Sequence, residues 1–163
     1  VVLVIGKTEG HIDQSLFARV VLDEKNGPPP EINLFNEKNN GETLLKLIDT
    51  NLIKSAHDVS LGGIITAVSK MCIKGNKGIN LKKPKYLISE IEYFFAEDQG
   101  RYIVEINKKD QKKVLDILNK NAVHYDELGT INENMLFLNE KTKVTIDELK
   151  RFNTNWLKDY MSN

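Results

Sequence analysis

A short segment of the chain, HDVSLGG at residues 57–63, combines the groups best suited to binding a small anion. Asp58 and Ser60 come at the end of an expected strand, and Gly62 and Gly63 open the helical pattern that follows. Glycines allow a ligand or another backbone to approach closely, and the free N–H groups at a helix start attract phosphate. A structural interpretation competes, because Ser60 can cap the helix while Asp58 accepts bonds from loop N–H groups. The residues alone favour the structural role and leave nucleotide binding by these four residues open.

A second polar cluster has the sequence EDQGR and follows an apolar helical pattern. Glu97, Asp98 and Gln99 could hold hydroxyls, amines or a cation, and Arg101 suits two-point contact with an anion. The alternative is that Gly100 ends the helix as its C-cap, while Arg101 pairs with Glu97 or Asp98 at the surface. Physical arguments favour the surface pair. The role of Glu97, Gln99 and Arg101 in nucleotide contact stays open as the second interpretation.

Three other kinds of site are not supported by the sequence. The loop Gly6-Lys7-Thr8 is no phosphate-binding P-loop, because that motif requires a glycine five positions earlier, where Val1 stands. Ser60 does not lie in the G-x-S-x-G turn of a serine hydrolase. The three histidines lie far apart, without a carboxylate or cysteine at ligand spacing, so no metal site is predicted.

Composition argues against a polyanion-binding or membrane protein. The 23 basic and 23 acidic residues leave no net charge, whereas binding to nucleic acid or an anionic membrane uses a basic excess. The longest apolar run, residues 1–5, is too short to cross a bilayer. Cys72 is the one cysteine, which excludes an internal disulfide and favours a reducing, cytoplasmic setting. Its place on an apolar helix face predicts a buried small hydrophobe.

The length of 163 residues supports one hydrophobic core, so residues 1–163 are expected to form a single domain. The chain opens on a core strand with no methionine, which indicates a piece cut from a longer protein. Strands are expected at 1–5, 54–59, 79–81, 101–106, 125–131 and 135–138, and helices at 16–21, 42–53, 62–73, 87–95, 110–121 and 146–161. This order predicts a single mixed α/β layer fold with a sheet flanked by helices.

The helix at 42–53 takes Asn40 or Gly41 as its expected cap. Residues 23–41, which contain three consecutive prolines, are expected to form a long ordered connection, because loops of this length inside a compact domain are uncommon and usually functional. Ile32, Leu34 and Phe35 are the apolar residues expected to anchor it.

Taken together and in order, these segments resemble phosphoribosylformylglycinamidine synthase, in the carboxy-terminal domain type shared with aminoimidazole ribonucleotide synthetase. The first segment follows the family pattern G-x-T-x-G-H-L-G-x-S, and the resemblance extends over nearly the whole chain. It departs from the family where Lys7 replaces a glutamate, Asp13 a glycine, and Leu61 the acidic residue of H-D-V-S-D-G-G. The matching residues are Gly6, Thr8, Gly10, His11, Ser15, Gly27, Pro28, Pro29, Pro30, Glu37, Gly41, His57, Asp58, Val59, Ser60, Gly62, Gly63, Phe95, Glu97, Gln99, Gly100, Arg101, Leu128, Gly129, Thr130 and Trp156.

The resemblance implies an ATP-dependent, amidine-forming ligase of purine biosynthesis. In that family the amide oxygen of formylglycinamide ribonucleotide is phosphorylated, and ammonia from glutamine then displaces the phosphate. ATP with Mg²⁺ is the implied cofactor of the whole enzyme. The implied partners are the remaining domains of the subunit, a glutaminase subunit and a small bridging subunit.

The resemblance also implies that this domain is catalytically silent alone. The family's synthetase subunit contains two copies of the domain type, and this chain resembles the later copy, which belongs to a non-catalytic pseudo-site. Scaffolding therefore ranks ahead of auxiliary nucleotide contact for the seven candidates. These are Asp58, Ser60, Gly62, Gly63, Glu97, Gln99 and Arg101.

Two alternatives stay open at the level of sequence. One is an independent nucleotide-binding regulatory module that reuses the turn at Gly62 and Gly63 and binds ATP or ADP alone. The other is a related ATP-dependent synthetase such as the aminoimidazole ribonucleotide enzyme. The three prolines followed by Glu37 and Gly41 argue against the second alternative.

Overall fold

The computed structural model describes residues 1–85, 88–139 and 141–162, and within them one mixed sheet organises the chain. Its strand order is β2-β4-β1-β5-β3-β6-β7. Neighbouring strands are antiparallel except for β3 and β6, which run parallel. The predicted mixed α/β class is therefore confirmed. The strands are β1 Val2–Ile5, β2 Ile53–Asp58, β3 Gly78–Leu81, β4 Tyr102–Ile106, β5 Tyr125–Asn132, β6 Met135–Leu138 and β7 Thr142–Thr145.

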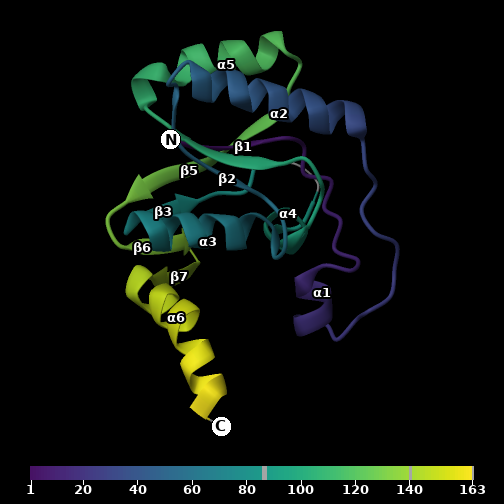
Figure 1. Cartoon of the computed structure of the whole chain (residues 1–163), viewed down its shortest axis with the longest axis vertical. Coiled ribbons are helices and arrows are strands. Elements are labelled where there is room, and N and C mark those ends of the chain that lie inside the picture. The colour runs from purple at the N-terminus through teal and green to yellow at the C-terminus, as the bar shows by residue number, and fades with distance from the viewer. Residues whose placement is uncertain (86–87, 140, 163) are drawn as a thin grey trace.

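Helices cover both faces of the sheet. Figure 1 shows α2 and α5 on one face and α3 and α4 on the other, with α1 to one side and α6 projecting away from the layers. None of the described helices is long and apolar enough to span a membrane. The helices are α1 Leu16–Val21, α2 Leu34–Asp49, α3 Gly63–Gly75, α4 Glu90–Phe95, α5 Gln111–Lys120 and α6 Ile146–Ser162, with a short 3-10 turn at Lys108–Asp110.

Alternate residues of β1 contribute to two separate cores. Val2 and Val4 belong to the core beneath α3 and α4, whereas Leu3 and Ile5 belong to the core beneath α2 and α5. Successive side chains of a strand point to opposite faces, so a strand covered on both sides is apolar throughout. The expected buried strand at 1–5 is thus a central strand of the sheet.

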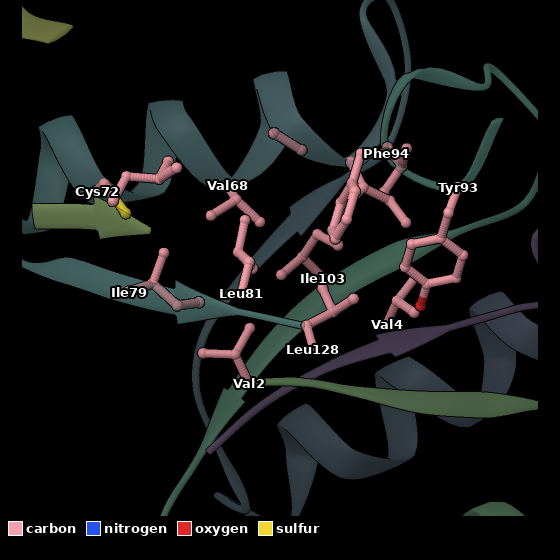
Figure 2. Close-up of a cluster of buried hydrophobic side chains, with 14 of the residues drawn as sticks. Val2, Val4, Val68, Cys72, Ile79, Leu81, Tyr93, Phe94, Ile103 and Leu128 are labelled. Atoms are coloured by element: carbon pink, nitrogen blue, oxygen red, sulfur yellow. The ribbon is translucent and has the colours of Figure 1, made fainter. Parts of the chain in front are cut away.

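The core beneath α3 is drawn in Figure 2. Val68 and Phe94 lie over Ile103 and Leu128 of the sheet. Tyr93 is also fully buried, and its hydroxyl donates a hydrogen bond to a carboxylate oxygen of β5 at 3.1 Å. Each fully buried apolar side chain of this size stabilises the fold by about 1.5–3 kcal/mol relative to exposure. This core also holds Cys72 in place, and the predicted burial of the thiol is confirmed.

The predicted long connection at 23–41 is wrong in its second half. Helix α2 begins at Leu34, where Asn33 accepts a hydrogen bond from the N–H of Asn36 at 3.0 Å, and it ends at Asp49. Neither Asn40 nor Gly41 caps it, because both lie within the helix. Ile32, Leu34 and Phe35 do not anchor the segment either, since all three are exposed.

The remaining differences concern element ends. The predicted helix over 87–95 is α4, which starts at Glu90, and residue 87 lies outside the described residues. Because α4 ends at Phe95 with Ala96 as C-cap, Gly100 is not a helix cap. Strand β7 was not expected from its pattern Thr-Lys-Val-Thr. The strands predicted at 125–131 and 135–138 exist, yet β3 lies between them in the sheet.

Candidate functional site

The polar cluster at residues 97–101 contacts both the loop after β1 and the start of α3, and Asp98 makes the contact with the loop. The carboxylate of Asp98 accepts hydrogen bonds from three consecutive backbone N–H groups, those of Glu9 at 3.0 Å, Gly10 at 3.1 Å and His11 at 3.1 Å. Successive N–H groups of this kind form a concave site for an anion. Here the anion is part of the chain, since the carboxylate belongs to Asp98, which is buried.

Arg101 is the next member of the site, and its side chain is buried rather than exposed. It retains only 1% of its accessible surface. Its guanidinium donates to the carbonyl oxygens of Ala96 at 2.7 Å and Asp98 at 3.1 Å, and to the hydroxyl of Thr8 at 3.0 Å. One nitrogen also lies 3.7 Å from a carboxylate oxygen of Asp98. The expected pairing with Asp98 is confirmed, but the expected surface position is wrong.

Glu97 joins the starts of two helices. Its Oε1 atom accepts hydrogen bonds from the N–H of Gly62 at 2.8 Å and from the N–H of Leu16 at 2.7 Å. Gly62 is the N-cap of α3 and Leu16 is the first residue of α1. A negative charge is stabilised at a helix start, where N–H groups lack partners within the helix. Ser60 does not cap α3 through its side chain, so that part of the structural interpretation is wrong.

The second glycine of the pair, Gly63, allows close contact with the end of α4. Gly62 and Gly63 have φ angles of 82° and 69°, a region that side chains with a Cβ rarely adopt. A Cβ on Gly63 would lie 2.6 Å from the carbonyl oxygen of Ala96 and 2.7 Å from that of Phe94. The sequence predicted that a ligand or another backbone comes close to these glycines. In the structure the backbone at the end of α4 comes close to Gly63.

Thr8, Glu97, Asp98 and Arg101, with the N–H groups they bind, are called the loop brace below. The loop brace ties the loop after β1 to the start of α3 and to the segment between α4 and β4. Sequence reasoning missed Thr8, which is buried although it lies in an apparently flexible loop. The family pattern G-x-T-x-G contains that threonine and was the one signal for it.

The other predicted site residues lie outside the loop brace. Asp58, Ser60 and Gln99 are exposed. The carboxylate of Asp58 lies 3.3 Å from the ring of its neighbour His57, and Gln99 donates to the main-chain oxygen of Glu97 at 3.4 Å. The structure therefore brings together Glu97, Arg101 and the glycine pair, and leaves these three side chains in solvent.

A polar cleft of about 670 Å³ lies beside the loop brace. Its wall includes His11, which is 2.9 Å from the carbonyl oxygen of Pro28 and so holds the proline segment against the loop. Sequence reasoning did not propose Asn36 or His124, which also line the cleft. They could not be found from spacing, because they come from α2 and from the residue before β5.

The site does not fit ATP with Mg²⁺. The N–H groups that could hold phosphate are already bonded to Glu97 and Asp98. Within the ranges that the structure describes, no group of three His, Cys, Asp or Glu residues is placed to bind a metal ion. Burial raises the pKa of Cys72 to about 11, so this thiol stays protonated and unreactive at neutral pH.

Fold and site together define a mixed α/β domain whose loops are fixed by internal carboxylates and a buried arginine. Residues 1–137 match the family described as "AIR synthase related protein, C-terminal domain". The chain belongs to this family. Part of the confirmed resemblance was carried by residues of the loop brace, Thr8, Glu97 and Arg101.

Relatives with curated names are similar over the whole chain. The chain is 68% identical over 163 residues to "Phosphoribosylformylglycinamidine synthase subunit PurL" of Pelagibacter ubique, covering 100% of this chain and 22% of the relative. It is 32% identical over 161 residues to the subunit of the same name from Rhodopseudomonas palustris, covering 99% of this chain and 22% of that relative. The chain thus spans 22% of the length of these relatives.

Solved structures show the same fold at lower sequence identity. Thermotoga maritima PurL complexed with FGAR has a TM-score of 0.74 and 22% identity, covering 91% of this chain and 27% of that one. The structure of PurLQS from the same organism gives 0.67 and 21%, covering 91% and 25%. A HypE–HypF complex gives 0.57 and 18%, covering 91% and 52%. Neighbours described with ATP, AMPPCP and ADP also share the fold.

Proposed function

We propose that residues 1–163 form the carboxy-terminal domain of a phosphoribosylformylglycinamidine synthase. The observation that carries this proposal is the 68% identity to a PurL subunit, which extends over all 163 residues. The matched span includes both polar clusters and the loop after β1, which the loop brace joins. The whole protein would convert formylglycinamide ribonucleotide to formylglycinamidine ribonucleotide, using ATP and the nitrogen of glutamine.

Within that enzyme the chain acts as a scaffold, and none of its residues is catalytic. Support comes from the loop brace, because Glu97 and Arg101 are bonded to main-chain groups and not directed at a free site. Gly63 serves the contact with the end of α4, and Gly62 donates its N–H to Glu97. ATP and Mg²⁺ belong to domains outside this chain, and no step of the reaction is assigned to the residues described here.

The three exposed candidate residues have a minor role in nucleotide binding. Asp58, Ser60 and Gln99 are accessible and could contact an auxiliary nucleotide only with help from a neighbouring domain. Such contacts would be single hydrogen bonds from flexible side chains. A site of this kind would bind weakly in the isolated chain, because ordering side chains and ligand offsets most of the gain.

The proposed surroundings of the chain are the other synthetase domains, a glutaminase subunit and a small bridging subunit, all in the cytoplasm. A structural neighbour described as PurLQS supports the partner subunits. The zero net charge gives no support to nucleic acid or an anionic membrane as partner.

Activity measurements on two proteins test the proposal. The native-length protein should form the amidine from formylglycinamide ribonucleotide, ATP and ammonia, while the 163-residue chain should show no ATP hydrolysis above a heat-denatured control. Calorimetric titration of the chain with ATP and ADP is the companion measurement. Micromolar binding by the chain alone would favour a nucleotide-binding regulatory module, and steady hydrolysis that survives repurification would contradict the scaffold role.

A further inference from the structure

The sequence Asn-Gly occurs twice in the chain, at Asn26-Gly27 and at Asn40-Gly41. Asparagine is one of the thermolabile residues, because its side-chain amide can react with the backbone nitrogen of the next residue. A glycine in that next position has no side chain to hinder the attack, and it lets the backbone bend as the reaction requires. The two pairs therefore have the same intrinsic chemistry, and their surroundings decide which of them reacts.

The first pair lies in an exposed segment without a helix or strand. Both Asn26 and Gly27 are exposed, in the connection between α1 and α2. Among the residues that the structure describes, none is hydrogen-bonded to the side chain of Asn26 or to the N–H of Gly27. The amide and the nitrogen that would attack it are thus both free.

Gln14 holds the main chain on either side of this pair. Its side-chain nitrogen donates to the carbonyl oxygen of Lys25 at 2.8 Å and to that of Gly27 at 3.1 Å. Its side-chain oxygen accepts a hydrogen bond from Arg19 at 2.9 Å, which fixes the direction of the amide. These contacts are called the Gln14 clamp below. The Gln14 clamp holds the two flanking carbonyl groups without bonding the atoms that would react.

The second pair has the opposite surroundings. Asn40 and Gly41 lie within α2, where backbone N–H groups are bonded inside the helix. Asn40 retains only 8% of its accessible surface, and its Nδ2 atom donates to the carbonyl oxygen of Gly100 at 2.9 Å. Reaction there requires the packed helix to open locally, which slows the reaction by about tenfold or more. The fold thus protects one pair and leaves the other accessible.

We propose that Asn26 is a site of spontaneous deamidation and that Asn40 is not. The nitrogen of Gly27 forms a bond with the Cγ atom of Asn26, the bond between Cγ and Nδ2 breaks, and the amide leaves as ammonia with the proton of the Gly27 N–H. The product is a cyclic imide. Water then adds to either imide carbonyl, breaks its bond to nitrogen and returns a proton to that nitrogen. An aspartyl or isoaspartyl residue results at position 26, and the net reaction consumes one water and releases one ammonia.

The modification changes both the charge and the main chain of the connection. The carboxylate of Asp13 lies against Gly27, since a Cβ built on that glycine would be 2.6 Å from its Oδ2 atom. A new carboxylate at position 26 adds a like charge next to this contact. The isoaspartyl form also lengthens the main chain by one carbon atom between the two carbonyl groups that Gln14 holds. The Gln14 clamp therefore loses a bond, and the connection becomes looser.

Mass spectrometry of the aged native-length protein tests the proposal. The folded protein is kept in water enriched in heavy oxygen and then digested with trypsin in ordinary water, so that only conversion in the folded protein introduces the label. Cleavage after Lys25, Lys38 and Lys46 separates the two pairs into peptides 26–38 and 39–46. Labelled acid should form at position 26 faster than at position 40 by about tenfold or more. In protein unfolded with urea, the two pairs should convert at similar rates.

Asn26→Gln is the matched variant, because glutamine keeps the amide but would have to form a larger ring, which closes slowly. It should abolish the labelled acid in peptide 26–38. Label that persists there in the variant would assign the reaction to another asparagine and overturn the inference. Absence of labelled acid at position 26 in the wild type would mean that the native-length protein covers or immobilises the pair. Equal rates at positions 26 and 40 in the folded protein would show that the fold does not select the site.

Limited proteolysis measures the effect on the connection. Cleavage after Glu24 by a glutamate-specific protease should be faster in the aged protein than in the fresh protein. It should approach the rate of fresh Gln14→Ala, which lacks the Gln14 clamp. Aged Asn26→Gln should be cleaved no faster than the fresh wild type. Equal cleavage of fresh and aged wild-type protein, once labelled acid has formed, would contradict the loss of the clamp.

Discussion

The loop brace and the α6 stripe, the exposed apolar row of Phe152, Trp156, Leu157, Tyr160 and Met161, differ in how completely the chain provides partners for their side chains. In the loop brace a buried arginine and two carboxylates all have partners within the chain. In the α6 stripe five large apolar side chains have no comparable cover. A region whose charged groups all have partners within the chain fixes the structure of the domain. A region whose large apolar side chains stay exposed requires another surface to cover them.

This difference reverses the first impression from the sequence. The polar clusters looked like binding sites because Glu97, Arg101 and the glycine pair are groups that bind phosphate in other proteins. Their own chain supplies the anion instead. The apolar residues of α6 looked like an ordinary helical pattern, yet they form the exposed region. Substitutions in the two regions should therefore affect different properties, stability in the first and assembly in the second.

The largest effect on stability is expected at Arg101. Arg101→Met keeps most of the side-chain volume but leaves Asp98 buried with fewer partners and frees the acceptors at Thr8 and Ala96. Removal of one partner from a buried ion pair costs about 3–5 kcal/mol. Urea unfolding followed by circular dichroism should show this loss. Arg151→Met on exposed α6 is the control, and a similar loss there would remove the contrast between the regions.

A second large effect is expected at the contact between Gly63 and the end of α4. Gly63→Ala places a Cβ 2.6 Å from the carbonyl oxygen of Ala96, at a φ of 69° that alanine rarely adopts. Strain of this kind and the required backbone shift together cost about 2–3 kcal/mol. The melting temperature reports the loss. Gly75→Ala is the matched control in the same helix, because nothing lies within 4 Å of its Cβ position.

The parts of the fold that depend on local pattern were predicted well from the sequence. Strand β1 is apolar at every position, and α3 has its apolar face and its glycine start within one segment. The start of α2 was predicted eight residues late because Asn39-Asn40-Gly41 resembles a turn. In the structure Asn40 donates to the carbonyl oxygen of Gly100 at 2.9 Å, a contact across 60 residues. No local rule contains that bond.

The bonds of the candidate site also join residues far apart in the sequence, which local patterns do not predict. Both polar clusters were found by residue type, but their connection through Glu97 and Gly62 joins positions 35 residues apart. The burial of Arg101 depends on Thr8, which is 93 residues away in the chain. Whether such groups face a ligand or each other is decided by topology. Single-sequence reasoning could therefore name Glu97, Asp98 and Arg101, but it missed Thr8 and could not assign the bonds of the loop brace.

A smaller effect is expected at Glu97, and it sharpens the comparison. Glu97→Ala leaves the N–H groups of Leu16 and Gly62 without their acceptor, and loss of the partner of the partly buried Gly62 N–H costs about 1–3 kcal/mol. The vacated position should accept inorganic phosphate. Added phosphate is then expected to raise the melting temperature of Glu97→Ala more than that of the wild type. Equal shifts in both proteins would show that the carboxylate does not occupy an anion position. Glu9→Ala, at an exposed position of the loop after β1, is the control.

The smallest effect on stability is expected where the effect on assembly is largest. Trp156→Asp removes an exposed side chain from α6, so the free energy of unfolding of the 163-residue chain should change by less than about 0.5 kcal/mol. Urea unfolding monitored by far-ultraviolet circular dichroism is suitable, because the substitution removes the only tryptophan. A loss comparable to that of Arg101→Met would mean that the stripe stabilises the domain itself. The distinction between a region that holds the fold and one that binds a partner would then fail, because α6 would belong with the loop brace.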